Sequence, residues 1–311
     1  MKVLLTGATG FVGKTLLSEL KLNNHTCIAA VRNYSPHLPK DIKQVVTGGL
    51  SPDQNWLTAL AGIDVVIHLA ARVHVMDDNA IEPMRLYKHT NADSTLNLAQ
   101  QAADAGVKRF IFLSTIKVNG EYSLADSPFQ EFVEHSPLDP YAASKWMAEQ
   151  SLIRIARDSE MEVTIIRPPL VYGPGVKGNF SSMMKWLDKG LPLPLGAVHN
   201  KRSLIAVDNL VDFILLCMTH PQAANETFVI ADGEDVSISE LLVRLGDVMN
   251  KKLWLFPVPV SFMELIAKIL GKQHVAQRLF GCLEVDISKA REVVGWRPAV
   301  SMVKQLNKMI K

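Results

Sequence analysis

Cysteine is scarce in this 311-residue sequence, and its few copies are scattered. Cys27, Cys217 and Cys282 are odd in number and lie far apart, without a CxxC pair or a Cys/His cluster. Such spacing supports neither a disulfide framework nor a set of zinc ligands. We therefore expect no metal site, and we expect the protein in a reducing compartment, the cytoplasm.

Long apolar runs and a large net charge are missing as well. No stretch reaches the ~18 apolar residues of a membrane span, and the apolar run at residues 3–5 is too short for a signal peptide. Lys and Arg number 33 against 31 Asp and Glu, so the formal net charge is +2. So small a charge creates no strong field for nucleic acid or an anionic membrane. We expect neither a nucleic-acid partner nor a membrane span.

The most apolar helix candidate is the segment at residues 262–270. It contains Glu264 and Lys268, and these two charges favour a helix that is buried or lies at an interface. Contact of this helix with a membrane is the alternative interpretation.

Short apolar runs alternate with longer amphipathic segments in the first half of the chain, and 48% of all residues are hydrophobic. Runs that are apolar throughout, such as residues 65–67, indicate strands buried on both faces of a parallel sheet. The expected strands are residues 3–5, 26–31, 44–46, 64–69, 109–113 and 163–166, and the expected helices include 11–22, 91–105 and 141–158. This alternation predicts an α/β protein with a doubly wound parallel sheet.

Beyond residue 168 the amino-acid composition changes. The stretch that follows is rich in proline and glycine, as is typical of loops. Shorter elements come after it, including a strand at 228–230 and a helix at 238–248, which we assign to a smaller lobe. We predict that residues 1–168 form the first domain. Residues 169–311 would form mainly the smaller C-terminal lobe, with segments near 203–222 returning to the first domain.

A glycine-rich turn, TGATGFVG, directly follows the first expected strand and opens the first expected helix. Gly7 permits the tight turn, Gly10 lets the backbone approach a pyrophosphate, and Gly13 allows close packing of helix on strand. The helix would begin at Phe11 and Val12, where free N–H groups and the positive end of the helix dipole favour phosphates. The turn predicts that the first domain is a Rossmann-like, NAD(P)-binding domain. A purely structural turn is the weaker alternative.

The end of the second expected strand bears on the choice of cofactor. NAD-preferring sites usually present a carboxylate there to the ribose 2′-hydroxyl, and the stretch Ala30-Val31-Arg32-Asn33 has none. The planar guanidinium of Arg32 instead suits a 2′-phosphate and can stack on adenine. We therefore favour NADP(H), with NAD(H) as the alternative if Arg32 simply points into solvent.

Tyr141 and Lys145 are four residues apart in an expected helix, so they share one helix face. A tyrosine is a poor base near neutral pH, and a nearby ammonium would lower its pKa. Tyr141 could then exchange a proton with a substrate oxygen while a hydride moves to or from nicotinamide. Ser114 and Thr115 end the expected strand before this helix, where open α/β sheets bind ligands. The alternative is a Tyr/Lys pair on the surface.

Taken together, these motifs resemble those of the extended short-chain dehydrogenase/reductases, and in particular the NAD-dependent epimerase/dehydratase family. The shared runs are, in chain order, TGATGFVG, HLAA from His68, LST from Leu113, PYAASK from Pro140, RPPLVYGPG from Arg167 and GWRP from Gly295. The resemblance implies a Rossmann-like doubly wound parallel sheet with a smaller C-terminal substrate-binding lobe. It also implies a nicotinamide cofactor and a nucleotide-diphosphate sugar as substrate.

The resemblance assigns roles to individual residues. Tyr141 would be the catalytic acid and base, Lys145 its pKa modulator and a ligand of the nicotinamide ribose, and Thr115 the partner of the sugar hydroxyl. Further cofactor contacts are implied at Leu50, Ala70, Ala71 and Pro168. Substrate contacts, with arginine pairing with the diphosphate, are implied at Asn179, Arg202 and Arg278. Family members often form homodimers, which would here use residues 91–105 and 141–158.

Two positions depart from the family's pattern. Sugar 4,6-dehydratases of the family have an Asp-Glu pair directly after the threonine, and here these positions are Ile116 and Lys117. Because isoleucine cannot exchange a proton, 4,6-dehydration is disfavoured. Gly49 stands where the family usually has an acidic residue for the adenine amino group, so adenine would be held by backbone or by packing.

Two enzyme functions stay open, since both need the same tyrosine, lysine and threonine. We put first a 4-ketoreductase, or the reverse dehydrogenase, which acts on a nucleotide-activated hexose or deoxyhexose with exchangeable NADPH, because it fits Arg32. The alternative is a nucleotide-sugar 4-epimerase of the UDP-glucose or UDP-N-acetylglucosamine type, which keeps its cofactor bound. A non-catalytic NADP-sensing regulator is a minor alternative, disfavoured because Tyr141 and Lys145 are both present.

Overall fold

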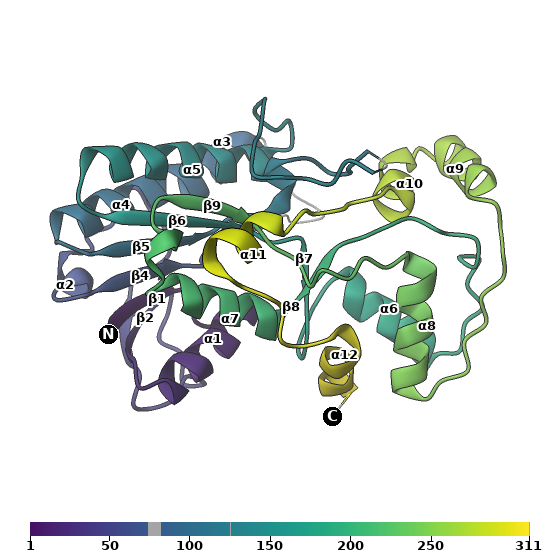
Figure 1. Ribbon diagram of the computed structural model, residues 1–311, viewed down its shortest axis with the longest axis horizontal. Helices are drawn as coiled ribbons and strands as arrows, with labels where there is room; N and C mark the ends of the chain where they lie inside the picture. The colour runs from purple at the N-terminus through teal and green to yellow at the C-terminus, as the bar shows by residue number, and fades with distance from the viewer. Residues whose placement is uncertain (74–81, 125, 311) are drawn as a thin grey trace.

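A seven-stranded parallel sheet forms the centre of the larger domain in the computed structural model, which describes residues 1–73, 82–124 and 126–310 (Figure 1). The strand order is β3-β2-β1-β4-β5-β6-β9, and every neighbouring pair is parallel. The strands are β1 (Lys2–Thr6), β2 (Thr26–Val31), β3 (Lys43–Val46), β4 (Val65–His68), β5 (Arg109–Leu113), β6 (Glu162–Arg167) and β9 (Glu226–Val229). This topology confirms the predicted fold class, a doubly wound α/β sheet.

Helices cover both faces of the sheet because successive side chains of each strand point to opposite sides. In β1, Val3 and Leu5 belong to one buried core, and Leu4 belongs to the other. The first core is covered by α1 (Phe11–Leu22), α7 (Val207–Cys217) and α11 (Ser288–Val294). The second is covered by α2 (Leu57–Leu60), α4 (Ser94–Asp104) and α5 (Pro140–Asp158). Between α2 and α4 lie α3 (Pro83–Tyr87) and the π-helical turn η1 (Lys88–Asp93).

The position of β9 corrects one sequence-based prediction. The strand expected at residues 228–230 was assigned to the smaller lobe, but β9 lies at the edge of the main sheet and pairs with β6. Phe228 and Val229 are fully buried there. The proline- and glycine-rich composition after residue 168 could not reveal the place of β9, because composition does not say which sheet a short strand joins.

The smaller lobe has its own core, built mainly from helices (Figure 1). Its helices are α6 (Asn179–Asp188), α8 (Ile238–Met249), α9 (Val260–Ile269), α10 (Gln273–Phe280) and α12 (Met302–Ile310). A two-stranded parallel sheet, β7 (Leu170–Tyr172) and β8 (Leu204–Ala206), connects it to the larger domain. Among the described residues, none of the helices combines the length and the apolar character needed to cross a bilayer.

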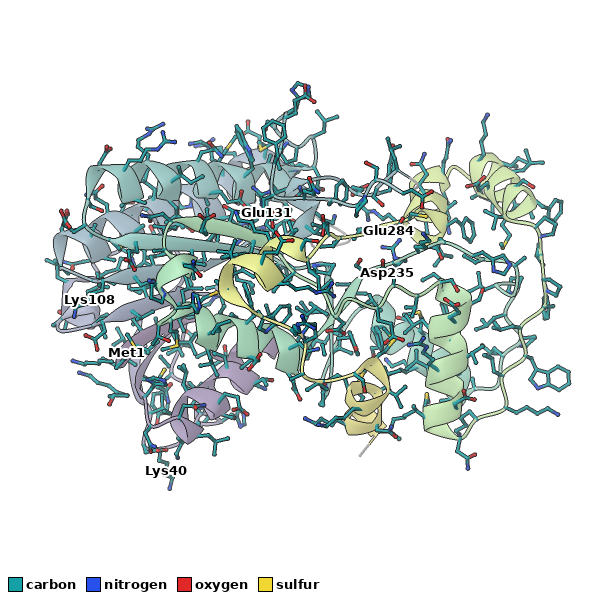
Figure 2. The ribbon with its side chains drawn as sticks, viewed as in Figure 1. Met1, Lys40, Lys108, Glu131, Asp235 and Glu284 are labelled. Carbon is teal, nitrogen blue, oxygen red and sulfur yellow. The ribbon has the colours of Figure 1, made fainter. Side chains whose placement is uncertain are left out.

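Backbone hydrogen bonds join the loop before α5 to the segment that follows α10. Figure 2 shows Glu131 over the larger domain, and Glu284 and Asp235 further toward the smaller lobe. The amide of Phe129 donates to the carbonyl of Glu284 at 2.8 Å, and the amide of Asp286 donates to the carbonyl of Phe129 at 3.0 Å. The loop before α5 is thereby tied to the segment that leads out of the smaller lobe.

The apolar helix expected at residues 262–270 is present as α9, but its burial differs from the prediction. All ten residues of α9 are described, and none of them is buried. The interpretation as a buried helix is therefore wrong, and α9 presents apolar side chains to solvent at the end of the smaller lobe (Figure 1).

Candidate active site

The glycine-rich turn between β1 and α1 is packed so tightly that side chains would not fit. Gly7 has a φ of +73°, and a Cβ there would lie 2.9 Å from the amide nitrogen of Ala70. A Cβ at Gly13 would lie 2.1 Å from the Gly7 carbonyl oxygen. In the described part of the chain, no side chain caps the N-terminus of α1, which starts after Gly10. The first N–H groups of α1 thus suit a pyrophosphate, as the motif predicted.

A buried histidine fixes the backbone beside this turn. His68, fully buried at the end of β4, bonds through Nδ1 to the Thr6 hydroxyl at 2.7 Å and through Nε2 to the Thr95 hydroxyl at 2.9 Å. Burial, with a smaller effect of Lys145, lowers the pKa of His68 to about 3, so its ring is neutral. Thr6 in turn accepts a hydrogen bond from the Ala70 amide at 3.1 Å. This network holds the backbone at Ala70, next to the glycine turn.

Tyr141 lies in the first turn of α5, where the Asp139 carboxylate accepts a hydrogen bond from the Ala142 amide at 3.0 Å and caps the helix. The Thr115 hydroxyl forms a hydrogen bond with Tyr141. The ring of Tyr87 packs edge to face against the ring of Tyr141, with 6.1 Å between the two ring centres. Burial, reinforced by the charge of Asp139, raises the pKa of Tyr141 to about 12 despite the Thr115 bond. The structure therefore brings Tyr141 and Thr115 together.

Lys145 lies one turn further along α5 and is almost fully buried. Its ammonium is 3.9 Å from the centre of the Phe112 ring. Burial lowers its pKa to about 7, although the carboxylate of Glu149 acts in the opposite direction. In the protein alone the pKa of Tyr141 is raised and not lowered, because burial disfavours the phenolate. The role of Lys145 as its pKa modulator stays a prediction.

Ser114 follows β5 directly and is only 4% exposed. Within the described chain its hydroxyl has no hydrogen-bond partner, while its amide donates to the Ile166 carbonyl at 2.7 Å. Buried hydroxyl groups usually find partners, so an unpartnered one next to Thr115 suits a ligand group. Ser114, Thr115 and Tyr141 thus lie at the carboxyl end of the parallel sheet, where ligands of this fold class bind.

Two positioning residues were missed by the sequence reasoning. Asn91, in η1, accepts from the Arg72 amide at 2.7 Å and donates to the Ser144 hydroxyl at 3.0 Å, which ties α5 to the segment after Ala71. The sequence shows Asn91 only as an asparagine near the start of an expected helix, and no motif there predicts that it links two distant segments. Glu149 on α5 receives two hydrogen bonds from Arg167, at 2.9 and 2.6 Å, in a buried ion pair.

The two predicted substrate arginines are neighbours in the smaller lobe. Arg202 is largely buried, and its guanidinium donates to the carbonyls of Arg278 at 2.9 Å and Gly281 at 3.0 Å. Among the described residues Arg202 has no carboxylate partner, and burial lowers its pKa. Arg278 instead forms an ion pair with Glu121 at 2.9 Å. Glu121 lies in the loop after Thr115 and also approaches Lys117, at 3.4 Å.

The remaining predicted contacts are spread around these groups. Arg32 is exposed at the end of β2, and Leu50 packs partly buried against the core of the sheet face that carries α4 and α5. Pro168 is buried after β6, and its carbonyl accepts from the Ile116 amide at 2.9 Å. The side chain of Asn179 lies outside the described part of the structure.

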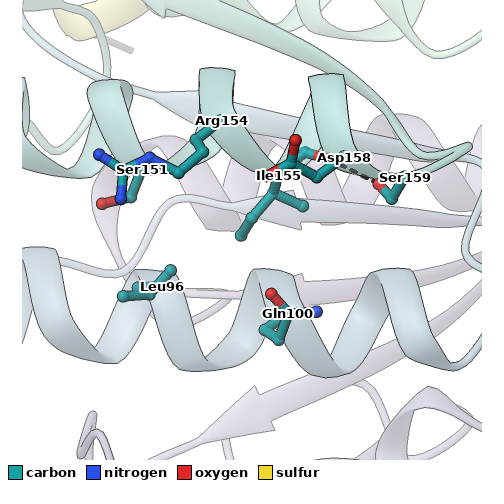
Figure 3. A pocket seen from close by; sticks show the side chains of 7 residues that line it. All are labelled: Leu96, Gln100, Ser151, Arg154, Ile155, Asp158 and Ser159. Carbon is teal, nitrogen blue, oxygen red and sulfur yellow. Dashed lines mark hydrogen bonds between the residues drawn. The ribbon is translucent and has the colours of Figure 1, made fainter.

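A separate hollow lies on the outer side of the larger domain, between α4 and α5 (Figure 3). It is lined by Leu96, Gln100, Ser151, Arg154, Ile155, Asp158 and Ser159. None of the predicted site residues is among these. The hollow lies on the two helices that the family resemblance suggests for a homodimer, which stays a prediction.

Known proteins are similar to this chain in sequence and in fold. Residues 3–231 match the model of the NAD dependent epimerase/dehydratase family. The chain is 46% identical over 297 residues to a UDP-glucose 4-epimerase of Vibrio cholerae, which covers 95% of this chain and 90% of that protein. It is 31% identical over 281 residues to the N-acetyl-alpha-D-glucosaminyl-diphospho-ditrans,octacis-undecaprenol 4-epimerase of Escherichia coli O157:H7, with 88% and 82% covered.

More distant matches include a sequence relative and a solved structure. A GDP-6-deoxy-D-mannose reductase of Pseudomonas aeruginosa is 24% identical over 318 residues, which cover 99% of this chain and 96% of that protein. The crystal structure of the Thermotoga maritima UDP-glucose 4-epimerase with UDP-glucose is similar with a TM-score of 0.79 and 25% identity. That similarity covers 100% of this chain and 97% of the other.

Proposed function

The chain belongs to the NAD-dependent epimerase/dehydratase family, as its motifs indicated, and we propose that it is a nucleotide-sugar 4-epimerase. From the sequence alone, a 4-ketoreductase is the first choice and a 4-epimerase the alternative. The 46% identical relative is an epimerase, whereas the reductase relative is 24% identical, so the support now favours the alternative. The choice of an epimerase is carried by the 46% identity to an epimerase. The pairing of Tyr141 with Thr115 at the carboxyl end of the sheet, with Lys145 one turn further along α5, supports the chemistry that both reactions share.

The proposed reaction needs a group that moves a proton at the sugar C4 oxygen. Thr115 would orient the C4 hydroxyl by a hydrogen bond, and Tyr141 would take its proton during oxidation and return it during reduction. When bound, the dinucleotide supplies the hydride acceptor and donor for the two half-reactions. Because burial raises the pKa of Tyr141 to about 12, its phenolate needs positive charge nearby. Lys145, in its protonated form, contributes such charge.

The substrate's diphosphate would be held by the smaller lobe. Arg202 is a buried cation whose described partners are backbone carbonyls, so an anionic ligand would gain from its uncompensated charge. Arg278 would assist once its guanidinium exchanges Glu121 for phosphate oxygens. Ile116 and Lys117 offer no carboxylate for elimination of water, in keeping with epimerisation and against 4,6-dehydration.

The cofactor proposal follows from the reaction. An epimerase reduces its own keto intermediate, so it needs no exchange of cofactor with the cell's pool, and we propose retained NAD(H). The exposed guanidinium of Arg32 would let the same site accept the 2′-phosphate of NADP(H). NADP(H) is the cofactor that Arg32 favours from the sequence alone.

A second candidate substrate is a sugar diphosphate carried by a polyprenol. The 31% identical relative is a 4-epimerase of such a compound. The observation in its favour is the exposed apolar surface of α9, because a lipid-linked substrate is presented at a bilayer. The diphosphate and the sugar chemistry would be the same for both candidates.

The deciding experiment distinguishes an epimerase from a reductase. It also distinguishes a nucleotide-linked sugar substrate from a polyprenol-linked one. Purified protein is denatured and its released dinucleotide identified by chromatography. The protein is then incubated with UDP-glucose, UDP-N-acetylglucosamine or N-acetylglucosaminyl-diphospho-undecaprenol in detergent, without added cofactor, and the sugars are separated. We expect galacto-configured product and co-purified NAD(H). Turnover of a 4-keto sugar that consumes added NADPH, without epimer formation, would support the reductase instead.

A further inference from the structure

Helix α9 is apolar on two opposite sides. Val260 and Met263 pack against the core of the smaller lobe. The other side of α9, with the residue that directly follows the helix, presents an apolar stripe with exposed fractions of 41–75%: Phe262, Leu265, Ile266, Ile269 and Leu270. Helices at a protein surface normally turn polar residues to water. A contiguous apolar stripe of this kind typically marks an interaction surface.

The apolar stripe continues into the segments on either side of α9. The stretch that leads from α8 to α9 runs along the outer end of the smaller lobe (Figure 1) and includes Trp254 and Phe256, which are 56% and 44% exposed. Val275, in the following helix α10, is 48% exposed. Tryptophan favours the boundary between water and lipid, because its ring is apolar and its N–H is polar.

The same part of the chain is basic, although the whole protein is close to neutral. From Lys251 to Arg278 there are five Lys or Arg residues and a single acidic residue, Glu264. Lys252 lies over the Trp254 ring at 5.0 Å, and Lys268 is exposed on α9. Basic residues around an apolar stripe suit the anionic headgroups of a lipid bilayer.

We propose that α9 and its flanking aromatic residues dock this protein on the surface of an anionic bilayer. A helix of ten residues is about 15 Å long, too short to span the membrane, so α9 would lie in the interface with its apolar stripe among the acyl chains. A second copy of the chain is a poorer occupant of this surface, because a symmetric contact would bring the lysines of the two copies together.

The docking surface adjoins the proposed substrate site. Helix α9 packs against α10, and α10 contains Arg278, whose carbonyl accepts a hydrogen bond from Arg202. A bilayer in contact with α9 would therefore lie next to the arginines proposed to hold the diphosphate. This last link rests on the proposed function, whereas the docking itself does not require catalysis.

The test measures binding of the full-length protein to vesicles by flotation. The vesicles contain phosphatidylcholine alone or phosphatidylcholine with phosphatidylglycerol. We expect binding to the anionic vesicles that weakens as salt is added. The double variant Ile269→Glu/Leu270→Glu should bind at least about tenfold more weakly, since two apolar side chains no longer enter the lipid. The matched control is Leu138→Glu, at an apolar residue that is 97% exposed and lies outside α9. This variant should bind as the wild type does.

Three outcomes would overturn the proposal: wild-type protein that floats with neither vesicle, a double variant that binds like the wild type, or a wild-type dimer that the double variant converts to monomer without any lipid binding. Light scattering distinguishes the last case. Epimerisation of a UDP-sugar, assayed on the same samples, should be unchanged in the double variant. If no substrate is turned over while the α9-dependent binding persists, the proposed function fails and the docking surface stands.

Discussion

Burial of Lys145 makes a prediction about stability that can be worked from its pKa. The pKa is about 7 in the folded protein, against 10.5 for an ordinary lysine. Between these values the unfolded chain binds more protons than the folded one, so the free energy of unfolding rises with pH. The slope for one such group approaches about 1.4 kcal/mol per pH unit. From about pH 7.5 to about pH 9 the gain is therefore roughly 2 kcal/mol.

The change that isolates this contribution is Lys145→Met, which removes the ammonium and keeps a similar length. Urea unfolding of cofactor-free wild type and variant, followed across this pH range, provides the difference in unfolding free energy. We expect the difference to shift in favour of the wild type as pH rises. Lys108→Met, at an exposed lysine shown in Figure 2, is the control and should produce no such shift. A pH-independent difference for Lys145→Met would mean that the ammonium keeps its charge in the fold, and the reasoning would be refuted.

Three further predictions concern the site. Tyr141→Phe should lower turnover by about a hundredfold or more without loss of bound dinucleotide, and near-normal turnover in a product assay would remove Tyr141 from the proton transfer. Arg32→Glu should weaken NADP binding far more than NAD binding in titration calorimetry, and equal losses would contradict a 2′-phosphate contact. Glu149→Gln should destabilise the fold by about 3 kcal/mol in urea unfolding, since Arg167 would stay buried without its carboxylate; an unchanged midpoint would contradict this.

The local features of the fold could be predicted from the sequence. The glycine turn, the strand and helix alternation and the spacing of Tyr141 and Lys145 all involve residues close together in the chain. Their conformations follow from backbone sterics and from the periods of helix and strand. The family resemblance added the order of the motifs, and it led to the correct family and fold class.

The contacts within the site depended on distant parts of the chain. Asn91 meets Ser144, and Glu121 meets Arg278 across 157 positions, and neither pair has a sequence spacing that marks it. The edge position of β9 is likewise a tertiary result. Such pairings are set by how the layers pack, and a pattern within one segment does not contain that information.

The charge state and the exposure of side chains show most clearly what the sequence determined and what the tertiary structure decided. The sequence by itself determined that a tyrosine and a lysine share a helix face and that the segment at residues 262–270 is a helix rich in apolar side chains. Only the tertiary structure decided that burial raises the pKa of Tyr141 and lowers that of Lys145, and that the apolar stripe of α9 faces water. The reason is that solvation depends on all the atoms surrounding a group, and folding brings those atoms from many parts of the chain.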